Sequence, residues 1–295
     1  MQDELLVATV AGGSARIIVT TTTHLVEEAR QRHDTYPTAS AALGRTLTAG
    51  LLLASNLKGN DTLTIRIMGD GPLGSIIVSA NAWSAVRGYV QNPHTHLPAN
   101  AVGKLDVGGA VGKGSLYVSR DLGFGEPYTG SVELVTGEIA EDIAQYLATS
   151  EQTPAAVALG VLVDTDNSVI AAGGFLVQMM PGATEETIAI LEANIKAFGP
   201  ITNVIASGTN AEGILHLLTN GLPMVLHEKR PVNFTCYCSK EKLEGILLSF
   251  GKEEIRDIIV TQRKAEITCH FCGDEYVFNQ AELEDLIERI ERQTI

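Results

Sequence analysis

The four cysteines of this 295-residue chain are confined to its last sixty residues. Cys236 and Cys238 form a C-x-C pair, and Cys269 and Cys272 form a C-x-x-C pair, with thirty residues between the pairs. Zinc prefers four thiolate or imidazole ligands at the corners of a tetrahedron, and two short cysteine pairs supply such a set. Gly273 follows directly, and glycine permits the positive φ that a knuckle turn often needs. The spacing therefore predicts one Zn²⁺ held by all four cysteines.

The C-x-C pair leaves two roles open for this metal. A disulfide between Cys236 and Cys238 would close a tight, strained ring, and strained disulfides are the labile, regulatory ones. The site is therefore a redox switch or a structural staple, and a segment that buries so little core needs a staple. From the residues alone the staple is favoured. A switch is also feasible, because zinc binding contributes roughly 10–16 kcal/mol in small sites and a whole domain is stable by only about 5–15 kcal/mol.

The charge of the chain argues against nucleic acid and membranes as partners. The formal net charge is −14, and residues 231–295 carry eight Lys and Arg against thirteen Asp and Glu, a net charge of −5. A nucleic-acid-binding module needs a local basic face. No apolar run approaches the roughly 18 residues of a membrane helix, and Asp3 and Glu4 stand where a signal peptide carries positive charge. We expect a cytoplasmic protein, where cysteines stay reduced.

Residues 1–181 are predicted to form an α+β domain with mixed or antiparallel sheets. The segment 39–57 has helical periodicity and mostly apolar faces, which indicates a buried helix. Short strands and glycine turns dominate the remainder without regular βαβ alternation. Strands are expected at 4–10, 15–23, 62–68, 74–80, 86–91, 157–164 and 168–180 and within 107–137, and further helices at 23–34 and 138–152.

Residues 182–231 are predicted to be a helical linker. Amphipathic helices are expected at 184–199 and 211–221, and their apolar faces must pack on another part of the chain.

Residues 232–295 are predicted to be a C-terminal zinc-binding domain. Ser239 can cap a helix behind the C-x-C pair, and the C-x-x-C pair lies in a strand–knuckle–strand pattern. Asn279 then begins a last helix, with Glu282 completing a capping box.

Three other patterns are weaker. The sequence GDGPLG at 69–74 matches a dinucleotide fingerprint, but β-like residues follow where that site needs a helix, so a hairpin turn is the better interpretation. His94 and His96 form an H-x-H pair that is expected to be plain surface. His270 lies between two cysteines, but four thiolates already complete the coordination of zinc.

The cysteine segments FTCYCSKEK and ITCHFCGDEYVF resemble the C-terminal zinc module of the redox-regulated heat-shock holdases, the bacterial family of 33 kDa chaperonins. RTLTAGLLLASNLK, IRIMGDGPLG and GGFLVQMMPGA are similar to N-terminal segments of the same family. The resemblance therefore covers the whole chain.

The resemblance implies a chaperone that is not an enzyme. In the reduced, inactive form, Cys236, Cys238, Cys269 and Cys272 hold one Zn²⁺. Peroxide or hypochlorous stress, especially with heat, forms disulfides Cys236–Cys238 and Cys269–Cys272 and releases zinc. The zinc module then unfolds, the linker is destabilised, and apolar surface binds unfolding client proteins without ATP. Active members form homodimers through the N-terminal domain. The client-binding residues form no compact motif. The resemblance defines neither the order in which the disulfides form nor the resting oligomeric state.

An alternative of a different class is an enzyme or ligand-binding protein that carries a purely structural zinc site of four cysteines. A staple should resist peroxide, and its loss should leave the N-terminal domain unchanged. A switch should lose zinc to peroxide and gain hydrophobic-dye binding.

The confinement of sulfur to one segment generates the first prediction. A cysteine elsewhere could form wrong disulfides with the four at the switch. One exposed cysteine introduced into residues 1–181 should therefore give scrambled disulfides and poorer recovery on reduction, as measured by peptide mapping after a cycle of peroxide and reductant. Clean, reversible switching of that variant would contradict this explanation.

Overall fold

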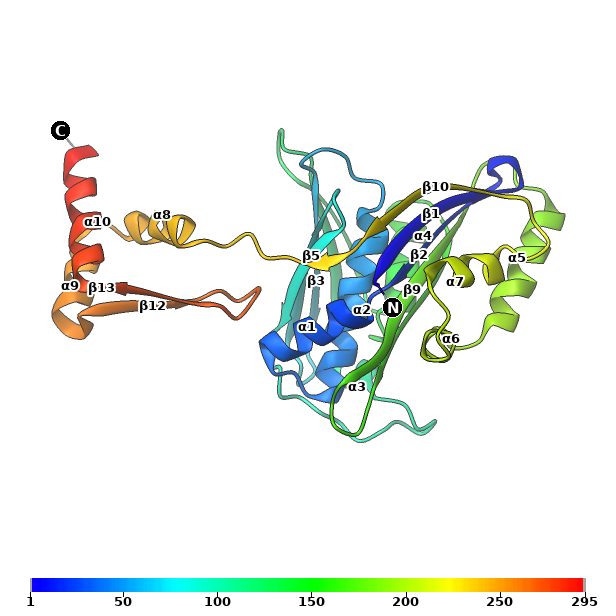
Figure 1. Ribbon diagram of the computed structural model, residues 1–295, viewed down its shortest axis with the longest axis horizontal. Helices are drawn as coiled ribbons and strands as arrows, with labels where there is room; N and C mark the ends of the chain where they lie inside the picture. Colours follow the sequence, from blue (N-terminus) through cyan, green and yellow to red (C-terminus); the bar gives the residue numbers. More distant parts are fainter. Residues whose placement is uncertain (1, 294–295) are drawn as a thin grey trace. The chain divides into compact units, whose positions relative to one another are not determined.

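The computed structural model describes residues 2–293 and divides into two compact units, Met1–Thr235 and Cys236–Ile295 (Figure 1). Each unit combines helices with hydrogen-bonded strands. Among the described residues the strand pairs are antiparallel except for one parallel pair, Asn233–Phe234 with Ala85–Val86. The prediction of an α+β fold with mixed or antiparallel sheets is therefore confirmed.

The first sheet of the N-terminal unit has five strands in the order β10-β1-β2-β9-β8. The central strands are buried on both faces, so their sequences are nearly continuous apolar runs. Its strands are β1 (Glu4–Val10), β2 (Ala15–Thr21), β8 (Ala155–Val163), β9 (Val169–Met179) and β10 (Met224–Pro231), with a 3-10 turn (Ala11–Gly13) between β1 and β2.

The second sheet has six strands in the order β11-β5-β4-β3-β6-β7. Buried and partly exposed residues alternate along β3, β4 and β5, which indicates one face toward the core. The GDGPLG segment is the turn between β3 and β4, as predicted, and no helix follows it. Its strands are β3 (Thr62–Gly69), β4 (Ser75–Asn81), β5 (Ala85–Val90), β6 (Gly114–Asp121), β7 (Tyr128–Glu133) and β11 (Asn233–Phe234).

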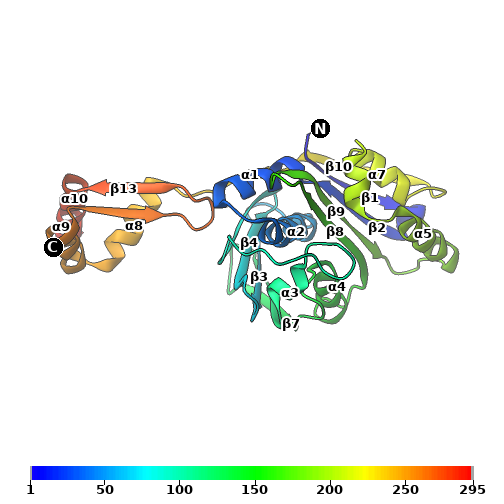
Figure 2. The same ribbon diagram turned by 90° about the horizontal axis from the view of Figure 1, so that it is seen from below.

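Helix α2 (Pro37–Ala54) lies between the two sheets (Figure 2). Sixteen of its eighteen residues are buried, which confirms the predicted buried helix. Gly44 and Gly50 let it approach its neighbours closely, because a Cβ on Gly44 would lie 2.5 Å from Val26 and one on Gly50 would lie 3.0 Å from Val78.

Three further helices complete this part of the unit. Residues 107–111 lie within the stretch 107–137 that was predicted to hold short strands and glycine turns. They are helical instead, and Asp106 caps the segment by accepting a hydrogen bond from the Gly109 amide at 2.9 Å. The helices are α1 (Thr23–His33), α3 (Val107–Val111) and α4 (Ala140–Thr149).

The predicted linker, 182–231, contains three helices and then a strand. Apolar residues of the helices pack with β1, β2 and β9 in one core cluster, so most of the expected apolar faces is buried against the first sheet. Leu217, which was expected on the buried face of its helix, is exposed. The last eight residues are strand β10, not helix, because they pair antiparallel with β1. The helices are α5 (Glu185–Phe198), α6 (Ile201–Ala206) and α7 (Ala211–Leu218).

The C-terminal unit surrounds a small core of seven buried apolar residues. Helix α10 begins after Asn279, whose side chain accepts from the Glu282 amide at 3.1 Å while Glu282 accepts from the Asn279 amide at 2.9 Å, so the predicted capping box is present. The elements are α8 (Lys240–Phe250), α9 (Lys252–Gln262), β12 (Lys264–Thr268), β13 (Glu275–Asn279) and α10 (Gln280–Gln293).

Within residues 2–293, no helix combines the length and apolar character needed to cross a membrane.

The packing of α7 generates the second prediction. Leu215 is fully buried against the first sheet, whereas Leu217 on the same helix is 50% exposed. Leu215→Ala should lower the free energy of unfolding of this unit by about 2–5 kcal/mol, measured by urea denaturation. Leu217→Ala is the matched control and should change it by less than about 0.5 kcal/mol. Equal effects of the two substitutions would contradict the packing described.

Candidate metal centre

The C-x-C pair lies between strand β11 and helix α8. Ser239 caps α8, its hydroxyl accepting a hydrogen bond from the Lys242 amide at 3.4 Å. The Lys242 ammonium donates to the carbonyl of Tyr237 at 2.6 Å. These contacts fix the backbone of the segment from Cys236 to Cys238 at the start of the helix.

The C-x-x-C pair lies in the turn between β12 and β13. The Cys269 amide donates to the Asp274 carbonyl at 2.9 Å, and the Gly273 amide donates back to the Cys269 carbonyl at 2.8 Å. Gly273 has a φ of 75°, a conformation that costs other residues about 1–2 kcal/mol. The knuckle glycine predicted from the sequence is therefore in the expected conformation.

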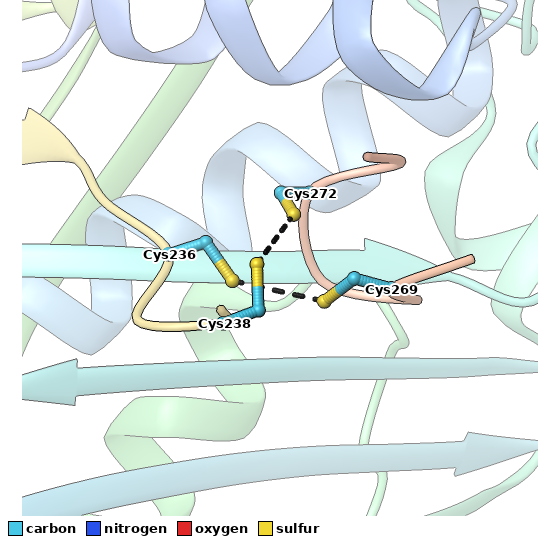
Figure 3. A group of neighbouring side chains, drawn as sticks. All are labelled: Cys236, Cys238, Cys269 and Cys272. Carbon is cyan, nitrogen blue, oxygen red and sulfur yellow. Dashed lines mark hydrogen bonds between the residues drawn. The ribbon is translucent and has the colours of Figure 1, made fainter. Parts of the chain in front are cut away.

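The four sulfur atoms converge (Figure 3). All four Sγ atoms lie within 4.8 Å of one another. Two contacts join one pair to the other: Cys236 Sγ to Cys269 Sγ at 3.7 Å and Cys238 Sγ to Cys272 Sγ at 3.3 Å. Four thiolates at about 2.3 Å from Zn²⁺ stand about 3.8 Å apart at tetrahedral corners. The donor set and its spacing therefore fit zinc, and the cysteines are free thiols.

Burial shapes the chemistry of the C-x-x-C pair. Cys272 is buried, and Cys269 is partly buried. Desolvation raises the pKa of both thiols above the usual thiol value, because a buried thiolate is less stable than a buried thiol. A bound divalent cation reverses this preference, since its charge stabilises the thiolates.

Tyr276 brings a hydroxyl into contact with one of the sulfurs. That hydroxyl lies 3.1 Å from Cys238 Sγ. The pKa of Tyr276 is raised, mainly by the hydrogen bond to Cys238 and to a lesser extent by burial. No role was assigned to this tyrosine from the sequence. The signal was its place four residues after Cys272 on strand β13.

The histidines considered as ligands are exposed. His270, between the two cysteines of the knuckle, is exposed. His94 and His96 have separate partners, Asp34 at 3.1 Å and the Thr38 hydroxyl at 3.1 Å, and both are exposed. The structure therefore does not bring the H-x-H pair together on one ligand.

The family model for Hsp33 protein matches residues 3–279. The chain belongs to the Hsp33 family. Among curated relatives, the 33 kDa chaperonin of Desulforamulus reducens is 54% identical over 293 residues, covering 99% of this chain and 100% of the relative. The 33 kDa chaperonin of Bacillus subtilis is 47% identical over 291 residues, covering 98% and 100%. These relatives span the whole length of the chain.

A solved Hsp33 structure has the same fold. The crystal structure of the 33 kDa chaperonin, heat shock protein 33 homolog, from Thermotoga maritima matches with a TM-score of 0.92 and 35% sequence identity, covering 99% of this chain and 100% of that one. The family suggested by the cysteine segments is therefore confirmed.

The convergence of the four sulfurs generates the third prediction. Cys272→Ser should weaken zinc binding by at least about a hundredfold, because it removes one of four thiolates. Zinc content per chain and chelator competition measure this loss. Ser239→Ala is the control, since it removes the helix cap beside Cys238, at a cost of about 1 kcal/mol, but leaves all four ligands. Full zinc retention in Cys272→Ser would contradict a four-cysteine site.

Proposed function

We propose that this protein is a redox-regulated, ATP-independent chaperone that binds unfolding proteins under oxidative and heat stress. The observation that carries the proposal is the convergence of all four cysteines of the chain within 4.8 Å, in a member of the Hsp33 family. The relatives' name, 33 kDa chaperonin, supports the chaperone role. The redox control rests on the chemistry of the cysteines.

In the reduced form, Cys236, Cys238, Cys269 and Cys272 hold one Zn²⁺. The metal supplies the positive charge that keeps four close thiolates ionised. Because both cysteine pairs bind the same ion, the C-x-C segment is held against the β12–β13 turn. The C-terminal unit is then folded and the protein is inactive as a chaperone.

Oxidation converts the four ligands into two disulfides, Cys236–Cys238 and Cys269–Cys272. In each pair one thiolate attacks hydrogen peroxide, forming a sulfenic acid and releasing hydroxide. The second thiolate displaces hydroxide from that sulfur and forms the disulfide. Two electrons pass from each pair to one peroxide. The thiolate ligands are then gone, and the metal is released.

Loss of the metal unfolds the C-terminal unit, because its core of seven buried apolar residues is small. The linker helices are destabilised next. Their buried residues, together with the face of the first sheet that they cover, supply apolar surface for clients. The active form is a homodimer through the N-terminal domain, residues 1–181, and acts in the cytoplasm without catalysing a reaction.

The second candidate is a protein whose four-cysteine site is only a structural staple, with a separate activity in the N-terminal domain. The small core of the C-terminal unit favours a staple as much as a switch. The response to an oxidant separates the two functions.

Treatment with hydrogen peroxide at raised temperature is the fourth prediction. We expect release of one zinc per chain, followed with a chromophoric chelator, and suppression of the aggregation of a heat-unfolded client, followed by light scattering. A thiol reductant with zinc should reverse both changes. The double variant Cys269→Ser, Cys272→Ser is the control: it lacks two of the four ligands and should show no peroxide-dependent release of zinc. Zinc that stays bound, or leaves without any gain in aggregation suppression, would establish the staple instead.

A further inference from the structure

Tyr276 links the two cysteine pairs without a metal. It lies on β13, directly opposite Ile267 on β12, and therefore belongs to the hairpin that carries Cys269 and Cys272. Its hydroxyl reaches the other pair, at Cys238 Sγ, 3.1 Å away. When Cys238 is a thiolate, as it is when it binds a metal or reacts with an oxidant, it carries no proton, and the hydroxyl is then the donor in this hydrogen bond.

The hydroxyl has no packing role that would explain it. Tyr276 packs with its ring against the core of the C-terminal unit. Phe278 lies two residues later on the same face of β13. It has no hydroxyl, and it is completely buried in that core. A phenylalanine at position 276 would pack in the same way. What the tyrosine adds is one hydrogen-bond donor directed at one sulfur.

A hydrogen bond to a thiolate stabilises its charge and lowers its reactivity. The donated proton withdraws electron density from the sulfur lone pair that attacks an electrophile. Side chains that donate hydrogen bonds to metal-binding residues change the electron density of those ligands in the same way. Cys238 is the cysteine that receives the tyrosine hydroxyl, so the effect is directed at the C-x-C pair.

We propose that Tyr276 is a positioning residue that restrains Cys238 and so limits the rate at which the C-x-C pair reacts with a hydroperoxide. As a statement about the redox switch it rests on the proposed function. In the step concerned, the thiolates of Cys236 and Cys238 and one hydrogen peroxide give a disulfide and two hydroxide ions. Whichever thiolate attacks first, Cys238 acts as attacking sulfur or as resolving sulfur, and the tyrosine slows it in both roles.

The test uses full-length, zinc-loaded protein and measures nucleophilicity directly. Wild type and Tyr276→Phe are treated with limiting iodoacetamide, and the initial alkylation rate of each cysteine is determined by peptide mass spectrometry. We expect Cys238 to react about two- to tenfold faster in Tyr276→Phe, the range that corresponds to the loss of one net hydrogen bond, with little change at Cys269 and Cys272. Initial formation of the Cys236–Cys238 disulfide with hydrogen peroxide should accelerate by a similar factor.

Cobalt supplies a spectroscopic readout. Co²⁺ in place of zinc gives sulfur-to-metal charge-transfer bands. Removing a donor from one thiolate raises the energy of its lone pair, so the band should move to lower energy in Tyr276→Phe while one Co²⁺ per chain is still bound. An unchanged band overturns the proposal.

Two variants separate the hydrogen bond from general loosening of the hairpin. Ile267→Ala removes the cross-strand neighbour but keeps the hydroxyl, and it should leave the Cys238 rate within about twofold of wild type. Difluorotyrosine at position 276 keeps the ring and strengthens the donor, so Cys238 should react more slowly than in wild type. An unchanged rate in Tyr276→Phe, an equal rise at all four cysteines, an equal rise in Ile267→Ala, or a faster rate with difluorotyrosine each overturns the proposal.

Alkylation does not depend on the switch, so the two hypotheses fail separately. If peroxide releases no zinc from wild type, the proposed function fails while the alkylation rates still decide the role of Tyr276. If wild type switches and Tyr276→Phe matches it in every rate, only the proposal about Tyr276 fails.

Discussion

The state of the C-terminal unit depends on four sulfur atoms held within 4.8 Å of one another. Like charges at that separation repel strongly where water is scarce, so the cluster is stable either as protonated thiols or around a cation. Burial of Cys269 and Cys272 raises their pKa values and favours the first state when no cation is present. A divalent metal makes the second state the more stable one. The core alone, seven buried apolar residues, supplies little to hold the two cysteine pairs together.

The N-terminal unit has no comparable dependence. Its sheets, helix α2 and the linker helices bury many apolar residues, and this burial stabilises the unit without a metal. Stability in this chain is therefore unevenly distributed, with one unit held by apolar packing and the other suited to a metal. Such a division suits an oxidant-dependent switch, since the oxidant then acts directly on the C-terminal unit alone.

Much of this arrangement could be predicted from the sequence, because it is encoded locally. Helix α2 follows from its apolar periodicity, the knuckle from Gly273, and the α10 cap from Asn279 and Glu282. Strand β10 could not be predicted in this way. Its residues are mostly exposed and lack alternation, and its conformation comes from pairing with β1.

Tyr276 escaped prediction for a related reason. Its contact with Cys238 depends on the register of β13 against β12 and on where the C-x-C segment lies. Neither is visible in a spacing of cysteines. Local patterns thus identified the four ligands, but the groups that tune a ligand come from distant parts of the chain.

The chain that leads into the metal site is paired at the edges of both sheets of the N-terminal unit, and its Val232 and Phe234 side chains are buried. The Val232 amide donates to the Asp3 carbonyl at 3.2 Å, and the Thr235 amide donates to the Val86 carbonyl at 2.9 Å. Cys236 is the next residue, so no free linker separates the last paired residue from the first cysteine. Each of these bonds belongs to an edge strand or its end, and edge pairs open at low cost. In the proposed switch, unfolding that begins at Cys236 would therefore break the pairing of β11 first and of β10 second, before it affected the central strands. Because β10 covers one edge of β1 and α7 packs on β1 and β2, the linker is the part of the N-terminal unit that such disorder would affect next after β11.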